Sequence, residues 1–234
     1  MLTIGISLFC VSLSYSAPLD WLKGKLQPAS ATKLSDTTVG SGLKEALKVG
    51  MENTIKLLGQ KDGYFGNQAV KILLPEIIQK AEPVLRNIGL GPKIDEFTLS
   101  MNRAAEKAAP VAADSFSSAI AEISFNDAQK ILQGGNTAAT EYLKTKTSAK
   151  LLEQFQPVVR KTMDEYAVTS KFEEIMGKAQ TLPLVGQYAN TMDIGTYVSS
   201  KALDGLFKIL GQQEAKIRTD PAARVTDLLK QVFK

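Results

Sequence analysis

Ser30 and Lys33 have the S-x-x-K spacing in which a lysine amine can activate a serine hydroxyl as a nucleophile. The pair lies in a linker-like segment rather than at the start of a core helix, so we interpret it as a chance match. Imidazole chemistry is not available, because the sequence contains no histidine. This excludes Ser-His-Asp and Cys-His catalysis, and it removes a usual ligand of zinc and haem. An iron–sulfur cluster is excluded as well, because the sequence has only one cysteine. Carboxylates, tyrosine, a Ser-Lys pair and oxygen-bound calcium or magnesium remain.

The segment Lys61–Asn67, KDGYFGN, contains oxygen-bearing side chains close together. It lacks the alternating ligands and the distal glutamate of a calcium-binding loop, so it predicts a turn. The glycine-rich signatures of nucleotide-binding loops are also missing from the sequence. We therefore assign no catalytic residue, no metal site and no cofactor.

The stretch Ile131–Ser148, ILQGGNTAATEYLKTKTS, places two glycines and an Asn-Thr pair before a lysine-bearing helical pattern. A helix N-terminus presents free N–H groups and a partial positive charge, so Thr137, Thr140 and Lys144 are candidate anion ligands. The same residue types also make an ordinary corner between helices. In that case Gly134 ends one helix in the left-handed conformation, and Thr137 or the preceding Asn caps the next. We favour the corner and keep the anion site as the alternative.

Asn102 and Arg103 are two further candidates for ligand binding, within another helical pattern. An arginine at such a position most often pairs with a glutamate or caps a neighbouring carbonyl. Ligand binding is the minority interpretation here.

Apolar residues recur at helical spacing along the chain, and no segment alternates convincingly like a strand. Pro110 must end or kink one helix, Asn126 can cap a short one, and Asp220 with Pro221 starts the last. The fold class is therefore all-α, a single multi-helix bundle-like domain with several Pro-kinked amphipathic helices. The expected helices cover residues 35–59, 73–88, 92–123, 126–132, 137–166, 197–217 and 221–233.

The last of these helices carries an apolar stripe. Its members are Val225, Leu228, Leu229, Val232 and Phe233. A helix this short is marginal alone, so we expect it to dock on the rest of the domain and bury Leu229 and Phe233. The alternative is that the stripe lies on a membrane surface or a partner.

Residues 1–16 carry no charged side chain, are mostly apolar and end in small residues, which is typical of a signal peptide. The run is shorter than the ~20 apolar residues that a spanning helix needs. We expect cleavage after Ser16, a tether over 17–34, a helical domain over 35–234 and a periplasmic location. Acylation of Cys10 is disfavoured, because bulky Phe9 stands where a lipoprotein signal has a small residue. The mature chain would contain no cysteine and no disulfide.

The composition, 44% hydrophobic and 22% charged, suits one folded unit with a sizeable core. The net charge of +4 is mild, and the basic residues are interspersed with acidic ones. A nucleic-acid partner is therefore not expected.

Several stretches together resemble the domain-of-unknown-function 4197 family (DUF4197), among them SMNRAAEKAAP from Ser100, GGNTAATEYLKTKTS from Gly134 and KALDGLFKILGQQEAKIRTDPAARVTDLLKQVF from Lys201. The resemblance covers about Leu34 to the C-terminus and implies an exported bacterial helical protein, without an established activity. The family motifs fall on Asn102, Arg103, Glu106, Thr137, Thr140, Lys201, Asp204 and Arg224. The chain departs from the family around Gly195, which puts an acidic or metal-binding role of that loop in doubt.

Three hypotheses on function follow from these patterns. The first is a non-enzymatic periplasmic module that binds an envelope partner or an apolar, lipid-like ligand between helix faces. The second is an envelope scaffolding protein, and the third is a hydrolase-type enzyme that uses carboxylates or a Ser-Lys pair. The sequence does not fix the oligomeric state.

Overall fold

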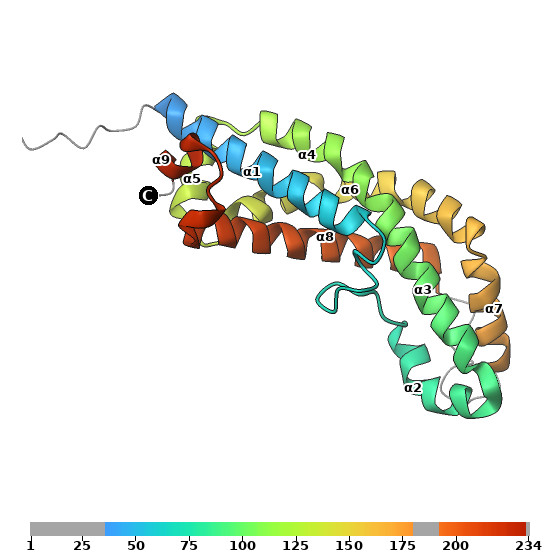
Figure 1. Ribbon diagram of the computed structural model, residues 1–234. Coiled ribbons are helices and arrows are strands. Elements are labelled where there is room, and N and C mark those ends of the chain that lie inside the picture. The colour runs from blue at the N-terminus through green and yellow to red at the C-terminus, as the bar shows by residue number, and fades with distance from the viewer. Residues whose placement is uncertain (1–35, 180–191, 233–234) are drawn as a thin grey trace, which may run out of the picture. The chain divides into compact units, whose positions relative to one another are not determined.

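The computed structural model describes residues 36–179 and 192–232, and within them the chain forms helices and no strand (Figure 1). The all-α prediction is confirmed. The α-helices are α1 (Asp36–Gly59), α2 (Glu76–Leu85), α3 (Gly91–Ala108), α4 (Ala112–Ala121), α5 (Phe125–Gln133), α6 (Ala138–Glu165), α7 (Val168–Ala179), α8 (Ile194–Thr219) and α9 (Asp227–Val232). None of the helices in the described part is both long and apolar enough to cross a membrane.

The long helices α1, α6 and α8 form the centre of the core, with α8 packed against both of the others. In α1 the predicted apolar face is buried, including Leu43, Leu47 and Leu58. Helix α4 adds Phe116, whose ring meets the edge of Phe207 from α8 at a centroid distance of 5.7 Å. The 3.6-residue period thus brings one apolar side of each helix into a shared core.

Pro110 interrupts the helical pattern where the sequence predicted it. Helix α3 ends at Ala108, a 3₁₀ turn covers Ala109–Val111, and α4 begins at Ala112. The proline ring has no N–H to donate and it clashes with the carbonyl of the preceding turn, which breaks the helix.

The corner before α6 differs from its prediction. Gly134 has φ −79° and ψ −178°, so it is extended and not left-handed. A glycine is needed there for space, because a Cβ at Gly134 would lie 2.6 Å from the Cβ of Ala138. By contrast, a Cβ at Gly135 would meet nothing within 4 Å.

Helix α5 is capped by Ser124 and not by Asn126. The Ser124 hydroxyl accepts a hydrogen bond from the backbone N–H of Asp127, and the Asp127 carboxylate accepts one from the N–H of Ser124. This reciprocal pair is a capping box, with an aspartate in place of the usual glutamate or glutamine.

The predicted helix over 221–233 is wrong at its start. Asp220 caps only a 3₁₀ turn, Pro221–Ala223, and α9 begins at Asp227. The chain leaves the helical path because Arg224 folds back to donate hydrogen bonds to the carbonyls of Ile217 and Arg218, at the end of α8.

Docking of α9 is confirmed for Leu229, which is fully buried, and the helix packs on α1. Val225, also predicted to belong to the apolar stripe, is 67% exposed and does not take part in this packing. Phe233 lies outside the described residues. A Cβ at Gly42 of α1 would lie 2.3 Å from Val232 Cγ2, so the absence of a side chain at this glycine allows α9 to pack closely on α1.

Asp193 begins α8 as its N-cap. Its Oδ1 accepts hydrogen bonds from the N–H groups of Gly195 and Thr196, and its Oδ2 pairs with Arg160 at 2.9 Å. Burial raises the pKa of Asp193, but the hydrogen bonds from Thr196 and the charge of Arg160 outweigh it, so the pKa lies below its ordinary value. The acidic side chain in this loop is therefore engaged by the helix.

Candidate functional site

The predicted anion site at the start of α6 already holds an anion, the side chain of Glu214 from α8. Its carboxylate accepts hydrogen bonds from the N–H groups of Ala139 (2.9 Å) and Thr140 (2.8 Å) and from the Thr140 hydroxyl (2.8 Å). Thr137 occupies the N-cap position of α6, but its side chain accepts no capping hydrogen bond from the helix. The physical expectation was sound, since a helix N-terminus favours a negative charge, but the chain supplies that charge itself.

Arg218 extends this arrangement to a third helix. Its Nε lies 2.9 Å from Glu214 Oε1, and its other nitrogens donate hydrogen bonds to the carbonyls of Ile131 and Leu132 at the end of α5. The Glu214 and Arg218 side chains are only 8% and 10% exposed. The pair therefore joins the end of α5, the start of α6 and α8 in one buried polar cluster.

Asn102 and Arg103 bind the chain's own segment 61–75. Buried Asn102 accepts a hydrogen bond from the N–H of Ile72 (2.8 Å) and donates one to the Ile72 carbonyl (2.9 Å). Arg103 pairs with Asp62 and Glu106, as its sequence interpretation favoured. The predicted ligand-binding residues of α3 thus fix the path of this segment.

Glu106 completes the attachment. Its Oε1 accepts hydrogen bonds from the N–H groups of Tyr64 and Phe65, both at 3.1 Å. The turn predicted at Lys61–Asn67 is confirmed, and it needs Gly63, because a Cβ there would lie 2.4 Å from the carbonyl oxygen of Leu57.

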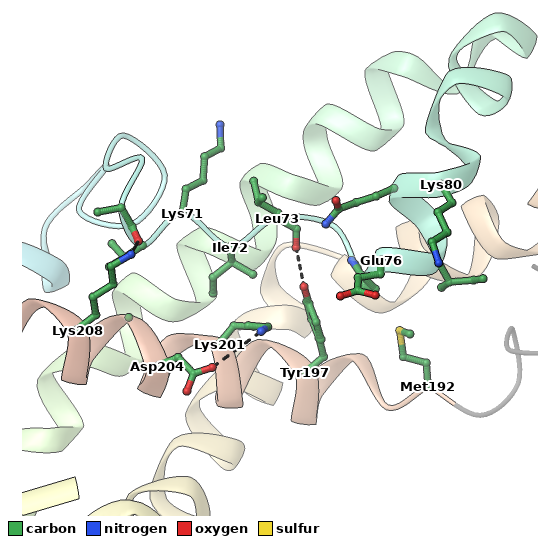
Figure 2. A pocket seen from close by; sticks show the side chains of 16 residues that line it. Lys71, Ile72, Leu73, Glu76, Lys80, Met192, Tyr197, Lys201, Asp204 and Lys208 are labelled. Atoms are coloured by element: carbon green, nitrogen blue, oxygen red, sulfur yellow. Dashed lines mark hydrogen bonds and ion pairs between the residues drawn. The ribbon is translucent and has the colours of Figure 1, made fainter. Parts of the chain in front are cut away.

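A groove lies between segment 69–80 and the first half of α8, with a volume of about 710 Å³. We call it the α8 groove. Its lining is partly apolar and partly charged: Val70, Ile72, Leu73, Pro75, Ile77, Met192 and Tyr197 are apolar or aromatic, and Lys71, Glu76, Lys80, Lys201, Asp204 and Lys208 are charged. Figure 2 shows Glu76 and Lys80 on one wall and Tyr197, Lys201 and Asp204 on the other.

Hydrogen bonds hold the two walls of the groove together. The Tyr197 hydroxyl donates to the Leu73 carbonyl at 3.0 Å (Figure 2), and the Lys208 ammonium donates to the Ala69 carbonyl at 2.9 Å. Burial, followed by the negative charge of Glu76, raises the pKa of Tyr197, so the phenol stays protonated and can donate. The groove is a preformed feature of the fold.

The positive charges of the groove are only loosely compensated. Lys201 Nζ lies 3.9 Å from Asp204 Oδ2, and these side chains are 49% and 64% exposed, so the pair is weak. Lys80 has no carboxylate partner within residues 36–179 and 192–232. Glu76 stands at the first position of α2, where the helix dipole stabilises its charge. The arrangement favours a ligand that brings carboxylates of its own.

Leu73 is the most exposed apolar side chain of the groove, at 55%. An open surface that presents this side chain gives contacts to a chain lying along it, but it does not remove a long apolar tail from water. Across the described part of the chain, no three carboxylate, histidine or cysteine side chains gather as metal ligands would.

Sequence reasoning did not select Leu73, Lys80 or Tyr197 as site residues. One signal was present, because Lys201 and Asp204 stand at matched family positions and both line the groove. The opposite wall comes from residues more than a hundred positions earlier, and only the folded chain brings the two together.

The comparisons with known proteins give a family and nothing more specific. The model of the family described as "Protein of unknown function (DUF4197)" matches residues 33–234, which is most of the chain. Neither a curated protein nor a solved structure matches the sequence.

Proposed function

The chain belongs to the DUF4197 family, whose description names no activity, and we propose from the geometry that it is a binding protein for an acidic, partly apolar peptide segment of a partner. The observation that carries this proposal is the α8 groove, which combines exposed Leu73 with the weakly compensated ammonium groups of Lys80 and Lys201. An extended peptide places alternate side chains on opposite sides, so apolar residues meet the groove while acidic residues reach the lysines at its rim.

A peptide fits this surface better than a lipid-like ligand does. An acyl chain gains its binding energy by leaving water, which requires an enclosed apolar space. The cavity between α1 and α8, lined by Leu43, Leu47 and Glu214, has a volume of only about 10 Å³, which is too small for an acyl chain. The groove is large, but its rim is charged and open. The partner form of the binding hypothesis is therefore the one we adopt.

Fluorescence anisotropy tests the proposal with a defined probe, a fluorescein-labelled ten-residue peptide of alternating Leu and Glu. The double variant Lys80→Glu, Lys201→Glu weakens binding at least about tenfold, since two attractive charges become repulsive. The matched control is Lys150→Glu, Lys161→Glu, which reverses two exposed lysines of α6 and leaves binding within about twofold of the wild type.

Two outcomes overturn the proposal. One is equal binding of the Leu-Glu peptide and a Leu-Lys peptide of the same length, which would show that charge has no part in recognition. The other is absence of Leu-Glu peptide binding to the wild-type protein. If the protein then takes up a fluorescent fatty acid and Leu73→Glu abolishes that uptake, the groove is assigned to a lipid.

The proposed place of action is the periplasm, after removal of residues 1–16. The support is the uncharged, largely apolar character of this stretch and its small residues at Ser14 and Ser16. Intact-mass measurement of protein from its host checks the proposal, with a mature chain that begins at Ala17 as the expected result. Retention of Met1 or acylation of Cys10 contradicts it.

A further inference from the structure

A second hollow, of about 390 Å³, lies between the start of α6 and the second half of α8. We call it the α6–α8 hollow. Its floor on α8 is Phe207, Gly211 and Ala215, and Thr137 and Lys144 line it from α6. All three candidate anion ligands of this stretch, Thr137, Thr140 and Lys144, therefore border an open hollow, and Thr140 also bonds to Glu214 in the buried cluster beside it.

Two small residues of α8, Gly211 and Ala215, border this hollow, and Gly211 lets Thr137 approach the helix closely. Gly211 and Ala215 are one helical turn apart on the same side of α8, and a Cβ at Gly211 would already lie 3.3 Å from Thr137 Cγ2. Glu214, the larger neighbour, is turned into the core and bonded to Thr140. The side of α8 that faces the hollow therefore carries short side chains at these two positions and is largely apolar.

The hollow lies next to the α8 groove along α8. Asp204 and Lys208 line both, and they stand between Lys201 in the groove and Gly211 in the hollow. From Tyr197 to Ala215 the helix rises about 27 Å, at roughly 1.5 Å for each residue. An extended peptide covers that distance with about eight residues, at roughly 3.3 Å each.

The charges agree with one acidic occupant along this path. Lys144, like Lys80, has no carboxylate partner in the described ranges 36–179 and 192–232. Lys208 donates to a backbone carbonyl and not to a carboxylate. Within the hollow Glu141 and Asp204 balance Lys144 and Lys208, so the positive excess along the path comes from the lysines of the α8 groove, and the hollow contributes its apolar floor.

We propose that the α6–α8 hollow is a second subsite of the α8 groove, and that the occupant is one extended acidic peptide of eight or more residues. This rests on the proposed function. The first part of the peptide lies against Leu73 and Tyr197, its backbone passes Lys208, and an apolar side chain further along packs on Phe207 and Ala215. Lys144 receives a carboxylate that follows that side chain.

Peptide length separates this inference from the proposed function itself. The probes are fluorescein-labelled Leu-Glu peptides of five and ten residues. Ala215→Trp fills the hollow and weakens the ten-residue peptide at least about fivefold, while the five-residue peptide, bound in the α8 groove alone, is unchanged. Ala149→Trp is the control, because it places the same ring at an exposed position of α6. Lys144→Glu, a surface change that preserves the fold, gives the same length-dependent loss.

The outcomes are distinct. If both peptides bind with equal affinity, and neither Ala215→Trp nor Lys144→Glu affects the longer one, the second subsite is refuted while the groove stands. If neither peptide binds the wild-type protein, the proposed function fails, and the subsite fails with it. If the longer peptide binds at least about fivefold more tightly than the shorter one, and Ala215→Trp removes this advantage, the inference is supported.

Discussion

Glu214 and Glu82 offer a matched comparison of a buried and an exposed ion pair. Each pairs with the arginine four residues later, at 2.9 Å to Arg218 Nε within α8 and at 2.8 Å to Arg86 Nε directly after the end of α2. The side chains of the first pair are 8% and 10% exposed, and those of the second are 30% and 39% exposed. The two pairs thus have the same sequence spacing and similar N–O distances, whereas the solvent exposure of their side chains differs.

Glu214→Ala removes the acceptor of two N–H groups of α6 and breaks the buried ion pair with Arg218. Breaking a buried pair in this way costs about 3–5 kcal/mol. Glu82→Ala costs about 0.2–1 kcal/mol, because the pair is exposed and Arg86 keeps Asp95 as a partner. In a folded unit of this size about 1 kcal/mol corresponds to roughly 2–4 °C in Tm, so Glu214→Ala lowers Tm by roughly 6–20 °C and Glu82→Ala by no more than about 4 °C.

Thermal unfolding followed by circular dichroism measures both changes under one condition. Hydrogen exchange adds a local test, since the amides of Ala139 and Thr140 lose their acceptor in Glu214→Ala and exchange faster. Glu214→Gln falls between the wild type and Glu214→Ala, because one acceptor oxygen remains while the charge is lost. Equal Tm values for Glu214→Ala and Glu82→Ala would refute the reasoning.

Three further predictions concern backbone space and acid stability. Gly63→Ala lowers the free energy of unfolding by about 1–3 kcal/mol, because the new Cβ meets a backbone carbonyl. Gly40→Ala, in open space within α1, raises it by about 0.5–1 kcal/mol. Urea midpoints of the two variants that shift in the same direction would contradict this. Gly134→Ala costs about 1–3 kcal/mol despite its ordinary φ, and Gly135→Ala changes the free energy of unfolding by less than about 0.5 kcal/mol; the same denaturation series checks both. Asp193→Ala costs about 1 kcal/mol at pH 7 through the lost cap of α8. Since folding lowers the pKa of Asp193, the stability that its carboxylate contributes is present above about pH 4 and is lost as the pH falls through the lowered pKa. The difference in free energy of unfolding between wild type and Asp193→Ala therefore shrinks on acidification, and a difference that grows would contradict the assignment.

The long helices were predictable because their periodicity extends over many turns. Helices α1, α6 and α8 each cover more than twenty residues, so the buried side repeats often enough to be recognised. Helix α7, Val168–Ala179, was missed, and α9 was started too early. At α9 the Asp-Pro signal was real, but it served a 3₁₀ turn that Arg224 then closed.

The site could be predicted only in part, because its contacts join distant segments. The sequence offered an anion site at the start of α6 only as the alternative to a helix corner, and it gave no sign that Glu214, seventy-four residues after Thr140, would fill the place. Asn102 was a candidate for ligand binding, but its partner is the backbone of Ile72, thirty residues away in the chain. Side-chain type and spacing describe what a residue can do, whereas the partner is decided by how the helices pack.

The most direct measurement of the central claim is a ¹H–¹⁵N NMR titration of the protein with the ten-residue Leu-Glu peptide. Binding in the α8 groove shifts the amides of residues 69–80 and 197–208, and binding in the second subsite adds those of 211–215 and 137–144. Amides around exposed Val84 and Ile88 stay unchanged. Shifts that gather at Val84 and Ile88, or an unchanged spectrum at saturating peptide, would contradict the account.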